Sequence, residues 1–137
     1  MKSLSSPPSA AADFLWEGIL SPEAVTSEVR AAGFGAVVSF EGRIRDEEEG
    51  KTILSLTYEA YPAMAQKEIA KIIKETETRW PVKAAARHRV GRVPVGEAAV
   101  VVACAGAHRE EAFAACRYLI DSVKDRAPIW KVRFECK

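Results

Sequence analysis

The chain has 137 residues, enough for one compact domain, and an apolar fraction of 48%, enough to fill one hydrophobic core. Its 20 basic and 19 acidic residues nearly cancel, and a formal net charge of +1 argues against a protein that coats a nucleic-acid backbone. The strongly apolar stretch of residues 98–105 is too short to cross a membrane, and residues 1–12 lack the apolar region of a signal peptide. We expect residues 1–12 to be a disordered lead-in and residues 13–137 to form a single domain.

Three cysteines, Cys104, Cys116 and Cys136, are widely spaced and form no CxxC pair. This usage favours a reducing compartment over a disulfide framework, so we expect a cytoplasmic protein. Zinc ligands usually come in close pairs, and the chain has only two histidines. We therefore expect no metal site and no resident cofactor, with the cysteines serving as small apolar side chains.

Residues 13–20 predict a short first strand, followed by a helix that begins at Ser21-Pro22-Glu23. Serine caps free N–H groups, and proline fits the first helical position. Gly33 and Gly35 are expected to end this helix.

The next part of the chain is rich in β-forming residues. Residues 36–45 and 53–59 predict two strands, and the acidic turn of residues 46–51 (DEEEGK) would join them as an antiparallel hairpin with a mobile tip. We interpret the carboxylates of residues 46–49 as a solvated loop rather than a metal site, because consecutive ligands rarely fit one ion.

Pro62 opens a long helix that should reach about Trp80, since apolar residues recur on one face. Residues 82–95 predict one or two strands, interrupted near Gly91 and Pro94, in which His88 supports its neighbours.

Residues 97–105 are apolar on both faces and predict a central strand. A second long helix should span residues 108–124 and end before Pro128. Its expected buried residues are Phe113, Cys116, Ile120 and Val123. Residues 129–136 alternate with period two, which predicts a last strand with Trp130 on its buried side. Together the elements predict an α+β domain with a mixed or antiparallel sheet, two long helices and a β-hairpin extension.

The sequence contains no GxSxG elbow, Walker loop, HExxH or GxGxxG motif. His108 and Arg109 stand at a predicted helix start, where free N–H groups favour anions, although on these residues alone a solvated surface pair is the favoured interpretation. Arg43 and Arg45 would share one face of a strand, again either as a site or as surface charge.

Lys124 and Lys131 flank the segment of residues 125–130 (DRAPIW). Lys124 falls at the end of a predicted helix, where the helix dipole already favours a cation. Lys131 alternates with Trp130 on the last strand. Each lysine is therefore explicable without a function, but a pocket that desolvated either one would adapt it for proton transfer.

Five blocks of sequence occur in order along the chain. They are residues 35–45 (GAVVSFEGRIR), residues 56–61 (LTYEAY) with Met64, residues 88–92 (HRVGR) with Gly96-Glu97, Ala107-His108-Arg109 with Ala112-Phe113, and residues 124–131 (KDRAPIWK). In content and spacing these blocks resemble the large, catalytic subunit family of molybdopterin synthase, over about residues 13–133.

The resemblance implies a transferase. In this family a small ubiquitin-like subunit inserts a Gly-Gly tail that ends in a thiocarboxylate, and its sulfur passes to cyclic pyranopterin monophosphate to form the molybdopterin dithiolene. The family also implies a hammerhead-like domain and a homodimer within a heterotetramer. Transferred to this sequence, it makes Lys124 and Lys131 catalytic, makes Arg45, His108 and Arg109 the substrate-binding cations, and makes Phe40 and Met64 pocket walls.

Two features depart from the family pattern. Many members carry a glutamate two residues after the lysine that matches Lys131, where this chain has Arg133, and many continue past the position of Lys137. These departures leave open a rival function, a non-catalytic module that binds a ubiquitin-like tail. The helix start at His108 and Arg109 leaves open a second one, a small phosphate- or nucleotide-binding protein.

Overall fold

The computed structural model describes residues 13–137, and the predicted lead-in of residues 1–12 lies outside them. The elements follow in the order β1 (Leu15–Glu17), α1 (Pro22–Ser27), β2 (Ala36–Arg43), β3 (Glu47–Glu48), β4 (Lys51–Ala60), α2 (Pro62–Arg79), β5 (Val82–Pro94), β6 (Ala98–Gly106), α3 (Arg109–Arg126) and β7 (Ile129–Cys136). This is the predicted α+β class, with two long helices of 18 residues each. The hammerhead-like outline stays a prediction.

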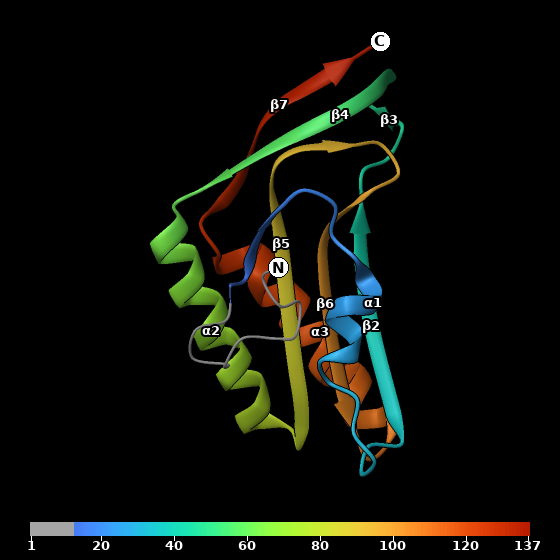
Figure 1. Ribbon diagram of the computed structural model, residues 1–137, viewed down its shortest axis with the longest axis vertical. Coiled ribbons are helices and arrows are strands. Elements are labelled where there is room, and N and C mark those ends of the chain that lie inside the picture. The colour runs from blue at the N-terminus through green and yellow to red at the C-terminus, as the bar shows by residue number, and fades with distance from the viewer. Residues whose placement is uncertain (1–12) are drawn as a thin grey trace, which may run out of the picture.

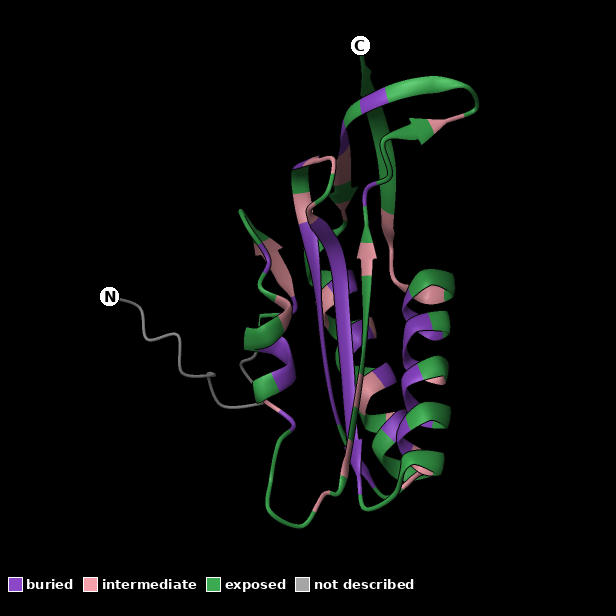
Figure 2. Ribbon diagram, turned by 90° about the vertical axis from the view of Figure 1, so that its right-hand side faces the viewer, coloured by how far each residue is buried: buried purple, intermediate pink, exposed green. Residues whose placement is uncertain are grey.

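The strands form one mixed sheet in the order β2-β6-β5-β4-β3, with β7 paired to β4 and β1 paired to β5. Every pairing is antiparallel except that of β1 with β5. The long helices α2 and α3 cover one face of the sheet, and the short α1 covers the other (Figure 1; Figure 2). β4 and β7 extend beyond the helices at the end of the molecule where the C-terminus lies (Figure 1).

The core lies on both sides of β5 and β6, because successive side chains of a strand point to opposite faces. All nine residues of β6 are buried, which confirms the predicted central strand (Figure 2). One face packs against α2 and α3 through Ala84, Ala86, Val100, Val102, Cys104, Ile69, Ile72, Cys116, Leu119, Ile120 and Val123. The other face packs against α1 through Ala85, Val101, Ala103, Ala105, Val25 and Val29.

The predicted helix starts are present, but two helices differ in length from the prediction. Ser21 caps α1 by accepting a hydrogen bond from the Ala24 backbone N–H at 3.1 Å. However, α1 ends at Ser27, well before Gly33. Pro62 opens α2 and Pro128 follows the end of α3, as predicted, although α3 continues to Arg126.

The predicted hairpin between residues 36–45 and 53–59 is wrong. β2 pairs along its length with β6, and the acidic turn joins β4 only to the two-residue β3. A buried central strand needs hydrogen-bonding partners on both edges, and β2 supplies the second edge of β6. The long partners of β4 are instead β5 and β7.

β5 is one strand rather than two, and its bend has a clear cause. Its first half, Val82 to His88, pairs with β6, whereas residues 91–94 pair with β4. Gly91 begins the second half with φ +89°, a conformation that a residue with a side chain rarely adopts. The glycine therefore lets one strand pass from the central sheet to the β4–β7 extension.

Three expected burials are wrong. Phe113 on α3 is 60% exposed, Trp130 on β7 is 36% exposed, and Cys136 is exposed at the end of β7. β7 lies at the outer edge of the sheet with seven of its eight residues exposed, so alternation along it does not produce a buried face. None of the helices in residues 13–137 has both the length and the apolar character needed to span a bilayer.

Candidate functional site

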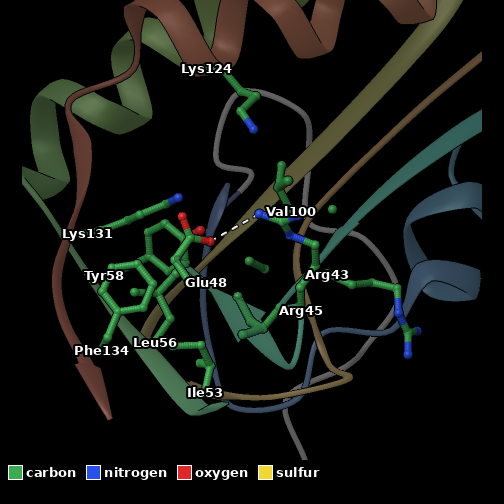
Figure 3. A pocket seen from close by; sticks show the side chains of 13 residues that line it. Arg43, Arg45, Glu48, Ile53, Leu56, Tyr58, Val100, Lys124, Lys131 and Phe134 are labelled. Atoms are coloured by element: carbon green, nitrogen blue, oxygen red, sulfur yellow. Dashed lines mark hydrogen bonds and ion pairs between the residues drawn. The ribbon is translucent and has the colours of Figure 1, made fainter. Parts of the chain in front are cut away.

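A cavity of about 230 Å³ opens where the end of α3, the end of β2 and the start of β6 meet β4 and β7 (Figure 3). The side chains around it come from six separate stretches of the chain. They are Gly42, Arg43, Ile44, Arg45, Glu48, Ile53, Leu56, Tyr58, Ala99, Val100, Lys124, Lys131 and Phe134. Of the predicted site residues, Lys124, Lys131 and Arg45 are therefore brought together.

Lys124 reaches the cavity from the last turn of α3, and the end of that helix is firmly held. Pro128 cannot continue the helix, and its carbonyl accepts a hydrogen bond from the Tyr61 N–H at 3.1 Å. Arg126 forms ion pairs of 2.6 Å with both Glu68 and Glu75 of α2. These contacts fix the helical turn that carries the lysine, because they tie both the helix and the turn after it to α2.

Lys131 reaches the cavity from β7, where it lies opposite Tyr58 of β4. Because neighbouring strand residues point to opposite sides, Trp130 turns away from the cavity. Its ring packs edge-on against Tyr61, with ring centroids 4.8 Å apart. Six residues lie between the two lysines in sequence, but the turn at Pro128 folds β7 back so that both point into the same space (Figure 3).

Arg43 and Arg45 both line the cavity, but not as alternating residues of one strand. β2 ends at Arg43, its register shifts between Gly42 and Arg43, and Arg45 lies in the following loop. Arg43 contacts Glu41 at 3.3 Å, whereas Arg45 contacts Glu48 at 3.1 Å (Figure 3). The lining therefore carries four cationic side chains and one carboxylate, that of Glu48.

Tyr58 lines the cavity, and the buried ring of His88 packs behind it. Their rings meet edge-on with centroids 5.0 Å apart. His88 Nδ1 lies 2.8 Å from the Arg89 carbonyl oxygen, so Nδ1 carries the proton that it donates. Burial lowers the pKa of His88, and the nearby charge of Lys124 lowers it further. Burial also raises the pKa of Tyr58. Both groups are therefore uncharged near neutral pH.

His108, Arg109, Phe40 and Met64 do not line the cavity of their own chain. His108 and Arg109 lie exposed at the start of α3, about 24 Å from Lys124 along the helix axis at 1.5 Å per residue. Phe40 lies just outside the rim, since its ring would be 3.4 Å from a Cβ placed on Gly42. Met64 is exposed in the first turn of α2.

Glu48, Val100 and Phe134 were not singled out from sequence. Glu48 belongs to an acidic run that gave no sign of facing a cluster of cations. Val100 and Phe134 sit on strands whose partners could not be read from the chain. Tyr58 and His88 fall inside the blocks that carry the family resemblance, and only that resemblance could have indicated that they lie near the site. Within residues 13–137, no group of three or more His, Cys, Asp or Glu side chains is arranged to hold a metal ion.

The fold and the cavity define a class: an α+β domain with a cationic cavity suited to an anionic ligand. Clustered cations in a partly enclosed space also stabilise negative charge that develops during a reaction. Comparison with known proteins identifies the family within this class. The family model described as "MoaE protein" matches residues 16–126. The chain belongs to the MoaE family.

Similar sequences from different organisms carry the same name. This chain is 42% identical over 113 residues to the molybdopterin synthase catalytic subunit of Thermoplasma volcanium, a match that covers 82% of each chain. It is 47% identical over 104 residues to the protein of the same name from Oryza sativa subsp. indica, where the match covers 75% of this chain and 54% of the longer relative.

Solved structures with a similar fold belong to proteins of related name. The chain resembles molybdopterin synthase from Staphylococcus aureus with a TM-score of 0.85 and 31% identity, over 90% of each chain. It also resembles a chain in the complex of subunits 1 and 2 of molybdopterin-converting factor from Helicobacter pylori. That match has a TM-score of 0.72 and 26% identity, over 85% of this chain and 80% of the other. Together these matches confirm the predicted family and the α+β fold.

Proposed function

We propose that this chain is the catalytic subunit of a molybdopterin synthase, a cytoplasmic enzyme of molybdenum-cofactor biosynthesis. In this proposal it transfers sulfur from the C-terminal thiocarboxylate of a small ubiquitin-like subunit to cyclic pyranopterin monophosphate. Membership of the MoaE family and the shared name of the relatives support the reaction. The observation that carries the proposal is the meeting of Lys124 and Lys131 in one cavity beside Arg45.

The roles of these residues follow from the charges of the two substrates. A thiocarboxylate and a phosphorylated pterin are both anions, so each needs a cation close to its charged group. In our proposal the thiocarboxylate sulfur displaces an oxygen substituent from a side-chain carbon of the pterin, so that a carbon–sulfur bond forms as a carbon–oxygen bond breaks and the tail is joined to the pterin as a thioester. Water then attacks the acyl carbon of the tail, and a second round with a second thiocarboxylate supplies the other sulfur of the dithiolene. The carbon–sulfur bond to the tail breaks, leaving a carboxylate on the small subunit and sulfur on the pterin. Lys124 and Lys131 stabilise the negative charge of the attacked acyl group.

Arg45 binds the substrate phosphate in this proposal, because a guanidinium offers several N–H donors in a planar fork that suits phosphate. Tyr58 and His88 exclude water beside Lys124 and add no charge of their own, since burial keeps both neutral. With His88 uncharged, the charge of the cavity comes from its lysines and arginines.

His108 and Arg109 enter the proposal through the homodimer. At about 24 Å from Lys124 along α3, they cannot reach the cavity of their own chain. Both are exposed and therefore available to a neighbouring molecule. We propose that they bind the substrate in the cavity of the second copy, and that Phe40 and Met64 extend the pocket wall once subunits assemble. A heterotetramer of two large and two small subunits follows.

The test is reconstitution of the reaction. The purified chain is mixed with the thiocarboxylated small subunit and cyclic pyranopterin monophosphate, and the dithiolene product is oxidised to its fluorescent derivative. We expect Lys124→Ala and Lys131→Ala each to abolish product while the fold is kept, because both are exposed and an exposed lysine contributes little to stability. Lys74→Ala, which removes an exposed lysine of α2 away from the cavity, is the matched control.

The assay also separates the rival functions. A non-catalytic module would bind the small subunit, form no product, and be insensitive to both substitutions. A phosphate- or nucleotide-binding protein would bind free nucleotides through His108 and Arg109 without the small subunit. Either result would overturn the proposal.

A further inference from the structure

One residue of the cavity has a charge opposite to all the other charged groups there. Glu48 lies on β3, a strand of two residues that is closed by a tight turn at Glu49 (φ +51°) and Gly50 (φ +80°). Glu47 and Glu48 both line a neighbouring hollow together with Arg45. Of this acidic turn, only Glu48 lines the cavity.

The Glu48 carboxylate forms an ion pair with Arg45. Its Oε1 lies 3.1 Å from Arg45 Nη2, and it points into the space that Lys131 also faces (Figure 3). A carboxylate on a guanidinium is the contact that an anionic ligand would make with the same arginine. Glu48 therefore occupies, within one chain, part of the site that the ligand needs.

The ion pair between Glu48 and Arg45 is weak enough for a ligand to displace. The side chain of Glu48 is 39% exposed and that of Arg45 is 78% exposed, so water screens the pair and its net strength is small. β3 is held to β4 by a register of only two residue pairs, Glu47 with Thr52 and Glu48 with Lys51. A ligand that offers several anionic oxygens to the cavity replaces one weak ion pair with several stronger ones.

We propose that Glu48 is a specificity-determining residue of the cavity, an intramolecular competitor that occupies Arg45 until an anionic group of the ligand displaces it. Small anions that contact Arg45 alone gain little by replacing one carboxylate, and so bind weakly. A ligand that engages Arg45 together with the lysines outcompetes Glu48. The proposal rests on the proposed function in taking this cavity as the anion-binding site.

The test measures binding of inorganic pyrophosphate to the full chain by calorimetry at low ionic strength. Glu48→Gln removes the competing charge and keeps the side-chain shape. Glu47→Gln removes the same charge from the neighbouring position, which does not line the cavity, and controls for the change in net charge. We expect Glu48→Gln to bind pyrophosphate roughly three- to tenfold more tightly than Glu47→Gln, which should stay near the original chain.

Equal or weaker binding by Glu48→Gln than by Glu47→Gln overturns the proposal, because Glu48 would then orient Arg45 for the ligand instead of competing with it. Failure of both variants to bind overturns it too, since removing a competitor should reveal the site. Arg45→Ala supplies a second criterion: in that background Glu48→Gln should no longer improve binding, and a persisting gain would refute direct competition.

These outcomes are separate from those of the proposed function. Pyrophosphate binding needs neither the small subunit nor the pterin. If Glu48→Gln tightens binding while Lys124→Ala still forms dithiolene, the competitor proposal holds and the catalytic assignment fails. If Lys124→Ala abolishes product but Glu48→Gln changes nothing, the reverse is true.

Discussion

Gly42 is the point in the cavity wall where one methyl group should have a large effect. It lies opposite Val100 in the pairing of β2 with β6. A Cβ added there would lie 2.7 Å from Val100 Cγ1, whereas carbon atoms pack at about 3.5–4.0 Å. Val100 is 5% exposed and β-branched, so it cannot easily turn out of the way. Gly42→Ala should therefore push β2 away from β6 at the cavity.

The expected cost is that of overpacking a buried contact, about 1–3 kcal/mol of unfolding free energy. Val100→Ala alone should also destabilise, by about 1.6 kcal/mol for two buried carbon groups. The loss of unfolding free energy in the double variant Gly42→Ala/Val100→Ala should differ from the sum of the two single losses, because alanine at position 100 leaves room for the new methyl group. We expect it to be more stable than the sum of the single losses by about 1 kcal/mol or more.

Urea unfolding of the four proteins, at one fixed protein concentration, measures this coupling. Gly33→Ala is the matched control, because a Cβ there would meet no atom within 4 Å, and it should leave the midpoint nearly unchanged. If the double variant loses the full sum of both single effects, Val100 is not the obstacle and the argument from close approach is refuted.

Three further predictions concern groups around the cavity and in the core. Because burial lowers the pKa of His88 below the unfolded value of 6.5, the unfolded chain takes up this proton first, so the contribution of His88 to stability is complete above pH 6.5 and is lost as pH falls below it. Unfolding free energies at pH 7.5 and 5.5 should therefore differ less in His88→Gln, and an unchanged difference would contradict the assignment. Arg126 is the main cause that holds the pKa of Glu75 at about 2, so Arg126→Ala should raise that pKa towards 4.5 in a carbon-detected NMR titration, and a value still near 2 would exclude this cause. Iodoacetamide should modify exposed Cys136 in the native chain and spare buried Cys104, as read by mass spectrometry, and equal labelling would show that the core opens freely.

Local patterns predicted the elements well, because the residues that set them are neighbours in sequence. The proline at each long helix, the cap at Ser21 and the all-apolar β6 needed no tertiary information. The pairing of β2 could not be derived in the same way. Two strands joined by a short acidic turn normally form a hairpin, but β6 competes for the same edge and buries more apolar surface. Only the completed sheet decides between them.

The predicted burial of Trp130 at the edge of the sheet was wrong for a related reason. Period two in β7 indicates that alternate residues share a face, not that this face is covered. The register of β7 with β4 also shifts between Thr57 and Tyr58, so the alternation is broken: Lys131 and Phe134 both line the cavity, whereas Trp130 does not. Trp130, Val132 and Phe134 are all at least partly exposed, because β7 extends beyond the helices. A sequence pattern reports the difference between two faces, whereas the packing of other elements determines whether either face is buried.

The candidate site was partly predictable. The family resemblance named Lys124, Lys131 and Arg45, and all three line the cavity. Local patterns alone would have left each as a surface charge. Glu48 could not have been found, because its significance depends on the turn that aims it at Arg45, and that turn was expected to be a freely moving tip.

His108 and Arg109 present the sharpest remaining question, and subunit mixing answers it. If they act in the cavity of a second copy, a dimer of one Lys124→Ala chain and one His108→Ala/Arg109→Ala chain contains one site with both defects and one intact site. Neither variant alone should form product. After mixing in equal amounts with subunit exchange, half of the dimers are hybrids with one working site of two, so activity should return to about a quarter of the original. If these residues act within their own chain, every site in every dimer keeps a defect and mixing restores nothing. Because the length of α3 holds His108 about 24 Å from Lys124, we expect the first result.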